Sequence, residues 1–305
     1  MPSERVRQWP CPNDVREIML DRLVRNALTE VSWNQARQLI KSSKILVNGE
    51  PVRDPSVHVH PGDVVTYDPD ARIVRTPSLS TVPILHLDSQ IVVVNKPAGI
   101  STVPYDETER DTLYHRVKQA LGANHRHGTT SLHVVHRIDK QTSGVVVFAR
   151  THSALLRLKQ LFRLHDIERR YMAIAHGSLK ARTFHSRLVA DRGDGKRGST
   201  FNPKLGRESV THVKPIEFLP SATLIQCTLE TGRTHQIRIH LAEAGFPLFG
   251  EHVYAKDQDF GFQVPRLMLH AMTLGFAHPV TALPLLFSAE LPDDMKHFID
   301  ALRRK

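Results

Sequence analysis

The chain has 305 residues, 40% of them hydrophobic, and contains no stretch near the ~20 consecutive apolar residues that span a bilayer. Its two cysteines, Cys11 and Cys227, are too few for a disulfide framework and lack metal-site spacing, so we expect a reducing, cytoplasmic setting. The 41 Lys and Arg residues against 31 Asp and Glu give a net charge of +10, which favours a nucleic-acid partner but also fits an ordinary basic protein.

The first 75 residues predict a short tail and a small folded unit. Residues 1–13 are polar and aperiodic, which is typical of a loose tail. From residue 15 apolar side chains recur at helical spacing, and Ser32 is a candidate N-cap of a second helix. Asn48-Gly49 between apolar runs indicates a β-hairpin. We therefore expect two helices and a small antiparallel sheet within residues 14–75.

Prolines recur between residues 69 and 83, so we expect a linker at 76–83 and a second domain at 84–305. In that domain the apolar patterns predict strands at 91–94, 144–149, 171–175, 223–229 and 267–272. Two helices are expected, one at 154–165 with Thr151 or Ser153 as its cap, and one through Ile237 and Leu241. Because strands and helices do not alternate regularly, we expect an α+β domain with a mixed, largely antiparallel sheet flanked by helices and loops.

Two patterns that could indicate ligand sites are weak. Residues 191–201 contain Gly-x-Gly-x-x-Gly, but charges surround the glycines and no helix pattern follows, so we expect an exposed basic loop there. Among the 19 histidines, the pairs His133/His136 and His235/His240 lack cysteine or carboxylate neighbours at zinc spacing. These histidines can equally pack or hydrogen-bond, and a metal-dependent RNA enzyme is kept as an alternative.

Two polar segments in apolar surroundings are candidates for chemistry. In residues 134–144, Asp139 lies between two core strands, where it could serve a site or merely close a turn by accepting backbone amides. In residues 231–240, a helix would direct Arg238 towards the sheet. A partly buried arginine requires a partner charge, for which Asp139 is a natural candidate. Alternatively, Arg238 lies on the surface and contacts phosphate.

These segments resemble the RluA-type family of RNA pseudouridine synthases. Residues 136–144, His-Arg-Ile-Asp-Lys-Gln-Thr-Ser-Gly, match the family signature His-Arg-Leu-Asp-x-x-Thr-Ser-Gly, with Ile138 for leucine as a mild departure. The other matching segments follow in the family's order, so the resemblance spans roughly residues 84–292; they are 95–99, 168–173, 232–238 and 267–271.

Residues 14–68 are similar to the small alpha-L RNA-binding domain of ribosomal protein S-four, which often precedes this catalytic domain. The similarity rests on residues 21–24, 47–49 and 61–63. It departs at Trp33-Asn34, where Arg-Ser is usual, and at residues 43–44, where a glycine is usual. The resemblance therefore implies the fold of an RNA-binding module in front of the catalytic domain.

The resemblance implies an isomerase that converts uridines in structured RNA to pseudouridine without a cofactor, a metal or an energy source. It makes Asp139 the nucleophile and Arg238 the charge partner that keeps Asp139 ionised. Tyr171 would stack on the uracil and help to remove the proton from carbon 5, although Tyr171 could also be a core residue of a strand.

Four more side chains are expected to contact the substrate or RNA. Arg137 would hold the flipped base out of its helix, and Leu269 would form an apolar wall for the ring. Lys96 and His136 lie in two of the matching segments and would contact RNA. The expected partner is large-subunit ribosomal RNA, with transfer RNA as the other candidate, and we expect a monomer without a membrane partner. An RNA-binding or assembly protein with an inactive synthase domain is the main alternative.

Overall fold

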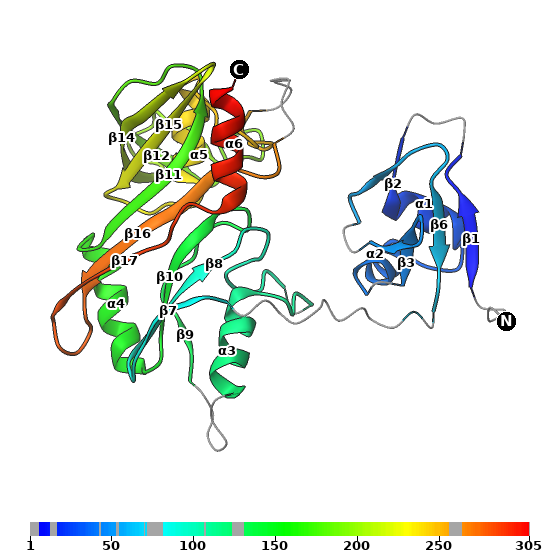
Figure 1. Ribbon diagram of the computed structural model, residues 1–305, viewed down its shortest axis with the longest axis horizontal. Helices are drawn as coiled ribbons and strands as arrows, with labels where there is room; N and C mark the ends of the chain where they lie inside the picture. Colours follow the sequence, from blue (N-terminus) through cyan, green and yellow to red (C-terminus); the bar gives the residue numbers. More distant parts are fainter. Residues whose placement is uncertain are drawn as a thin grey trace. The chain divides into compact units, whose positions relative to one another are not determined.

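The computed structural model describes residues 6–12, 17–42, 44–52, 55–69, 71, 82–106, 108–123, 131–255 and 264–304. The chain divides into two compact units, Met1–Ser80 and Thr81–Lys305 (Figure 1). Residues 76–81 of the predicted linker lie outside the described residues, whereas Val82 is buried in the core of the larger unit. Within the described residues no helix is long and apolar enough to cross a membrane.

The smaller unit contains the two predicted helices, α1 (Leu20–Ala27) and α2 (Trp33–Lys41). Ser32 caps α2 as predicted, because its side chain accepts a hydrogen bond from the backbone of Gln35 while the Gln35 side chain accepts one from the backbone of Ser32. The predicted hairpin turn is also confirmed, since Asn48 and Gly49 have positive φ values of 52° and 86° between β3 (Ile45–Val47) and β4 (Glu50–Pro51).

The predicted loose tail is wrong for residues 7–11. β1 (Arg7–Pro10) pairs antiparallel with β6 (Val64–Tyr67), and the four-stranded sheet has the order β1-β6-β3-β4. The side chain of Cys11 is 1% exposed in the core of this unit. Likewise, Ile18 lies in the short strand β2 (Ile18–Met19), which pairs with β5 (His58–Val59), rather than in the first helix. β1 begins with two exposed polar residues and β2 is only two residues long, so neither strand produces a clear alternating pattern in the sequence.

The larger unit is built on one mixed sheet, as predicted. Eleven strands pair in the order β13-β12-β14-β15-β11-β16-β10-β8-β7, with β17 beside β16 and β9 beside β10. Every strand pairing described in this sheet is antiparallel except that of β10 with β16. The strands are β7 (Ile84–Leu87), β8 (Ile91–Lys96), β9 (His133–Val134), β10 (Ser143–Ala149), β11 (Glu168–His176), β12 (Arg182–Val189), β13 (Gly198–Thr200), β14 (Arg207–Leu219), β15 (Ala222–Leu229), β16 (Leu269–Ala277) and β17 (Pro284–Ser288).

Four helices cover the sheet, and alternate residues of each strand belong to opposite faces. On β10, Val145 and Val147 pack in a cluster with α4 (His152–Leu164), whereas Val146 and Phe148 pack with α3 (Leu113–Ala123). On β11, Ala173 and Ala175 share a cluster with α5 (Gln236–Glu243), and its intervening residues share one with α6 (Asp293–Arg303). Burial on both faces explains the continuous valine runs in the sequence.

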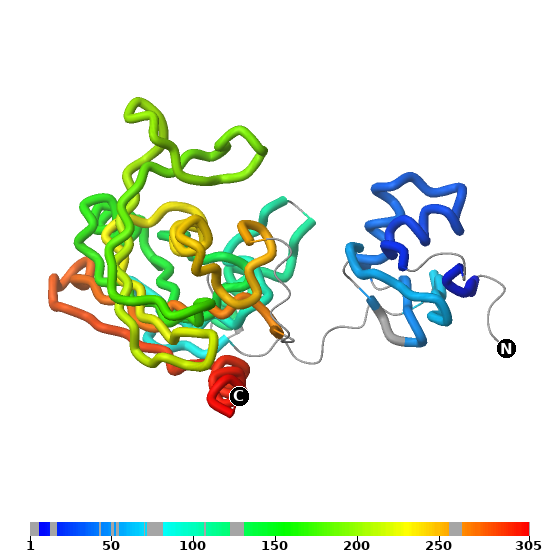
Figure 2. Tube along the Cα trace, turned by 90° about the horizontal axis from the view of Figure 1, so that it is seen from above, coloured from blue at the N-terminus to red at the C-terminus, as the bar shows by residue number. Residues whose placement is uncertain are grey.

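The expected exposed loop at residues 191–201 is only partly a loop. Residues 191–195 are exposed, but Gly198–Thr200 form β13 and pair with β12. In Figure 2 the yellow-green part of the chain, which holds β12 and β13, stands out from the rest of the larger unit. The segment is therefore an ordered hairpin extension of the sheet.

The pairing of β10 with β16 fixes Gly144 as a glycine. Gly144 lies opposite Ala271 in the parallel register and has a φ of +117°, a backbone conformation that residues with a Cβ atom rarely adopt. A Cβ atom at Gly144 would collide with the backbone carbonyl of Ala271. Beside it, Ser143 Oγ and His270 Nδ1 are 2.9 Å apart within hydrogen-bonding distance. The end of the 136–144 segment is thus fastened to the 267–271 segment.

Gly144→Ala is expected to lower the free energy of unfolding of the larger unit by more than ~3 kcal/mol, because the added methyl group meets backbone on a neighbouring strand and φ is unfavourable. Calorimetry of the full chain would measure the loss. The matched control is Gly122→Ala on α3, where a Cβ would have open space, and this change should not destabilise. Equal stability of the two variants would contradict the close approach of β10 and β16.

Candidate active site

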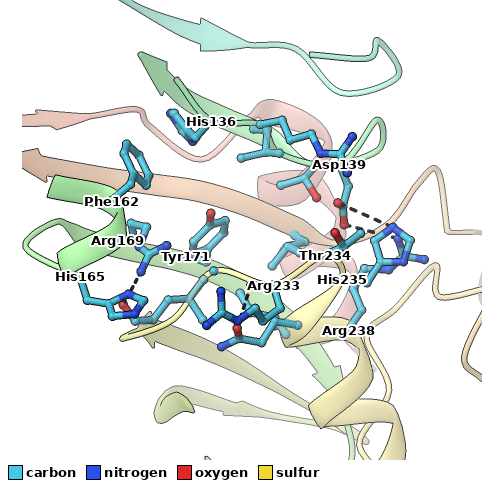
Figure 3. A pocket seen from close by; sticks show the side chains of 18 of the residues that line it. His136, Asp139, Phe162, His165, Arg169, Tyr171, Arg233, Thr234, His235 and Arg238 are labelled. Carbon is cyan, nitrogen blue, oxygen red and sulfur yellow. Dashed lines mark hydrogen bonds and ion pairs between the residues drawn. The ribbon is translucent and has the colours of Figure 1, made fainter. Parts of the chain in front are cut away.

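A cavity of about 570 Å³ opens in the larger unit beside Asp139. Figure 3 shows its side chains converging from five segments of the chain, with Tyr171 in the middle. The lining residues are Val135, His136, Arg137, Ile138, Asp139, Thr142, Phe162, Arg163, His165, Arg169, Tyr171, Leu229, Gly232, Arg233, Thr234, His235, Gln236, Ile237, Arg238 and Leu269. Four of the five segments that resemble the family therefore meet at one place, although up to 133 positions separate their lining residues, whereas residues 95–99 do not line the cavity.

Asp139 lies in a tight turn, and its carboxylate faces the cavity. The backbone of Thr142 donates to the carbonyl of Asp139 over 3.1 Å, so a turn is present, but its backbone closes it and not the side chain of Asp139. Before it, the backbone of Ile138 is held by Thr102, whose hydroxyl donates to the Ile138 carbonyl and accepts from its amide. Among the described residues, the Asp139 carboxylate contacts the side chains of Arg238 and His235 rather than a backbone amide.

Arg238 contacts two carboxylates, those of Asp139 and Glu251. Its Nη1 is 3.4 Å from Asp139 Oδ2, whereas its Nε and Nη2 are 2.7 and 2.9 Å from the two carboxylate oxygens of Glu251. The predicted pairing of Arg238 with Asp139 is therefore present, but it is the looser of two. A bidentate pair leaves the guanidinium little freedom, so Glu251 fixes the direction in which Arg238 presents Nη1 to Asp139.

Glu251 itself is fully buried and ionised. Burial would raise the pKa of Glu251, but the hydrogen bonds and charge of Arg238 outweigh it and hold this pKa below its usual range. The backbone amides of Val253 and Tyr254 also donate to Glu251. Burial opposes the charge of Arg238 as well, yet the Glu251 carboxylate keeps the Arg238 pKa above its usual value. Both groups therefore remain charged at neutral pH.

His235 lies near the other carboxylate oxygen of Asp139. Its Nε2 is 3.7 Å from Asp139 Oδ1, and its Nδ1 lies 2.7 Å from the hydroxyl of Tyr254. Burial, with the nearby Arg238 charge, lowers the pKa of His235 despite the Asp139 carboxylate, which favours a neutral ring. The residue has a φ of 60° and is the N-cap of α5, so it precedes the first turn of the helix that carries Arg238.

Tyr171 and Leu269 form the middle and one wall of the cavity. They lie on the adjacent strands β11 and β16, and Tyr171 packs against two core clusters at once. Burial raises the pKa of Tyr171 to about 12, so the phenol keeps its proton at neutral pH. Tyr171 is therefore a core residue of its strand and also lines the cavity with its ring, so the two interpretations of the sequence are compatible.

His136 and Arg137 lie at the rim. The His136 ring stacks on Phe162 with centroids 4.7 Å apart, and its Nε2 accepts a hydrogen bond from the Val147 backbone. Burial lowers the pKa of His136 to about 3, so the ring is neutral and its position is fixed. Arg137 is exposed beside it, as a side chain that enters RNA would have to be.

Lys96 does not reach the cavity, and its expected contact with RNA is wrong. The side chain is 0% exposed, and its ammonium donates to the backbone carbonyls of Pro97, Ile100 and Lys140. Burial lowers the pKa of Lys96 to about 7, opposed by the charge of Asp139. Lys96 thus ties the loop that follows β8 to the turn that carries Asp139, which is a structural role behind the site.

Sequence reasoning missed three side chains of this site. Glu251 and Tyr254 follow an apolar run, and an acidic residue directly after such a run was the available signal for Glu251. Arg169 is 7% exposed, donates to the carbonyls of Leu229 and Glu230, and has a buried Nε without a hydrogen-bond partner in the described structure. Among all described residues, those of this site included, no group of three or more His, Cys, Asp or Glu is placed to hold a metal ion.

Comparison with known proteins gives the geometry a context. Residues 90–243 match the model of the RNA pseudouridylate synthase family, and residues 20–65 match that of the S4 domain. The chain is 36% identical over 295 residues to ribosomal large subunit pseudouridine synthase D of Zymomonas mobilis, covering 91% of each protein. It is 35% identical to an uncharacterised RNA pseudouridine synthase of Bacillus subtilis, covering 91% of this chain and 92% of that protein.

A solved structure agrees with the sequence matches. The human RNA pseudouridylate synthase domain-containing protein 4 superposes with a TM-score of 0.62 at 25% identity, covering 72% of this chain and 93% of that one. The expected order of an S-four-like module and a synthase domain is confirmed by the two family matches. These matches lend no support to the alternative of an RNA-binding protein with an inactive synthase domain.

Proposed function

Because this chain belongs to the RNA pseudouridylate synthase family and is an RNA pseudouridine synthase, we propose that it modifies large-subunit ribosomal RNA with Asp139 as its nucleophile. The observation that carries the residue assignment is the pair of linked ion pairs at the cavity, in which buried Glu251 holds Arg238 close to the carboxylate of Asp139. The substrate follows from the names of the relatives, which include ribosomal large subunit pseudouridine synthases.

The chemistry asks four things of the site. The uridine must leave its stack to reach a cavity, at a cost of a few kcal/mol. A carboxylate nucleophile must then be ionised and directed at the nucleoside, which the Arg238 guanidinium favours. The bond between N1 and the ribose breaks, the uracil turns, and a bond from carbon 5 to the ribose forms. Finally carbon 5 loses its proton while N1 gains one, so the reaction is an isomerisation.

The four other predicted site residues that line the cavity have roles that suit their positions. The neutral ring of Tyr171 stacks on the uracil and faces the proton on carbon 5, while Leu269 bounds the ring on its apolar side. Arg137, exposed at the rim, fills the space that the flipped uridine leaves in the RNA. His136 is held by the Val147 amide and Phe162, and it shapes the cavity rather than titrating within it.

Pseudouridine mapping tests the substrate. Large-subunit ribosomal RNA from cells that lack this protein should lose at least one pseudouridine, and the purified chain should restore it in an unmodified transcript of that RNA. Total transfer RNA from the same cells is the parallel sample. Loss confined to transfer RNA would refute the ribosomal assignment while leaving the enzyme class intact.

Removal of the smaller unit is expected to weaken RNA binding. A chain without residues 1–75 should bind the transcript more weakly, with a shallower dependence of log affinity on log salt, because phosphate contacts set that slope at about −0.7 to −0.9 per phosphate. Filter binding at several salt concentrations measures both quantities. An unchanged slope would mean that residues 14–68 do not contact phosphates.

A further inference from the structure

A second cavity of about 600 Å³ adjoins the active-site cavity. The two cavities share the lining residues Gly232, Arg233 and Thr234. The second cavity lies between these residues and the hairpin extension seen in Figure 2. Its remaining lining residues are Leu188, Val189, Ala190, Asp191, Arg197, Leu205, Gly206 and Arg207.

Hydrogen bonds hold together the side of the cavity that β12 and the start of β14 form. Arg187 donates from Nε to the carbonyl of Leu205 and from Nη2 to that of Gly206, which holds the start of β14 against β12. Gly206 has a φ of +70° and leaves no room for a Cβ beside the Leu188 carbonyl. On the opposite edge, the backbone of Ser199 donates to Glu243 on α5. The hairpin is thus tied both to itself and to the helix that carries Arg238.

The lining carries more positive charge than its carboxylates balance. Arg197, Arg207 and Arg233 line the cavity, and none of them forms an ion pair with a described carboxylate. The one acidic lining residue, Asp191, accepts the backbone amides of Gly193 and Gly195. Nearby Glu208 is paired with His185, and only its backbone carbonyl accepts from Arg233. The cavity is therefore lined by three guanidiniums and by one carboxylate, which already accepts two backbone hydrogen bonds.

Neighbouring arginines also repel one another. Burial and the charge of Arg207 lower the pKa of Arg233, and burial with the charge of Arg233 lowers that of Arg169. Arg169 lies in the active-site cavity on the other side of Gly232, so these arginines extend from one cavity into the other. Like charges held together without carboxylate partners cost free energy, which a bound polyanion would recover.

We propose that the second cavity binds a phosphodiester of the RNA strand next to the flipped uridine, through the guanidiniums of Arg197, Arg207 and Arg233. This inference rests on the proposed function, since it needs a uridine in the adjoining cavity. A phosphate with flanking riboses suits the site because guanidiniums present paired donors to phosphate oxygens. The contact fixes the register of the strand without reading its sequence, so the arginines select position and not base.

The test uses the full chain with an unmodified transcript of large-subunit ribosomal RNA as the probe. The double variant Arg197→Ala with Arg207→Ala should bind about 10-fold more weakly and lower the magnitude of the salt slope by about 0.7 to 0.9, as expected for one lost phosphate contact. As a control for an exposed charge elsewhere, Lys214→Ala removes one positive charge from β14 outside the cavity. Phosphate-ethylation interference then locates the lost contact.

Two results would overturn the proposal. One is a salt slope for the double variant equal to that of Lys214→Ala. The other is an interference pattern in which ethylation beside the modified uridine weakens the wild type and the double variant equally. Thermal unfolding of the double variant at the wild-type midpoint shows that the fold is kept. Pseudouridine formation by the wild type on the same transcript tests the proposed function separately, because binding and interference need no turnover.

Discussion

Replacing Asp139 by asparagine is expected to abolish pseudouridine formation, with a loss of about 10⁴–10⁶-fold, as is usual when a nucleophile is removed. The amide has nearly the shape of the carboxylate but carries no negative charge, so it cannot attack the nucleoside or form an ion pair with Arg238. The fold should survive, because the side chain is partly exposed and the turn is closed by the Thr142 backbone.

Tritium release from RNA labelled at carbon 5 of uridine measures this loss. Asp300→Asn on α6 is the control, since it alters an exposed carboxylate that pairs only with a neighbouring arginine in the described structure. RNA affinity should stay within a few-fold of the wild type, because Asp139 contributes no donor to phosphate. Appreciable release by the Asp139→Asn protein would overturn the nucleophile assignment and require another carboxylate or a different reaction path.

Glu251→Ala is expected to lower the free energy of unfolding of the larger unit by about 3–5 kcal/mol. Removing one partner of a buried ion pair leaves the other charge uncompensated, and here Arg238 would be left with only the looser contact to Asp139. The backbone amides of Val253 and Tyr254 would lose their acceptor as well. Calorimetry is the suitable measurement, because both tryptophans, Trp9 and Trp33, lie in the smaller unit.

The milder change Glu251→Gln separates stability from chemistry. A neutral side chain keeps the shape and an acceptor for Arg238 but not the second charge, so the guanidinium should be held less firmly in the direction that presents Nη1 to Asp139. The rate of tritium release should fall while the affinity for RNA changes little. Glu290→Ala, at an exposed pair with Lys296, is the control and should change stability by less than about 1 kcal/mol. Equal stability of the Glu251 and Glu290 variants would contradict a structural role for the buried pair.

Local patterns predicted much of the fold because they depend on few residues. The cap at Ser32, the turn at Asn48-Gly49 and the valine runs of β8 and β10 all follow from short stretches, and each is confirmed. The strands β12 and β14 were missed since their outer face is solvated and rich in charge. The helix α6 was missed too, although Asp293 and Asp294 in its first turn are a typical start signal.

The site was predictable as a set of segments but not as a geometry. Arg238 was expected to need a carboxylate, and that reasoning was sound, yet the tighter partner is Glu251 rather than Asp139. The choice depends on a loop that follows α5 and on burial, neither of which has a short-range pattern. Lys96 shows the opposite failure, because a lysine beside a site in sequence can still point behind it.

The parallel pairing of β10 with β16 has a consequence for biosynthesis. Ser143 and His270, which meet there, are 127 positions apart, so at ~5–20 residues per second about 6–25 seconds separate their translation. During that interval the valine-rich β10 lacks one neighbour, and β11 lacks the same one, since β16 lies between them. During its synthesis the larger unit therefore has an unoccupied strand position in its sheet and no completed cavity. Catalytic competence arises only when a late strand enters that position.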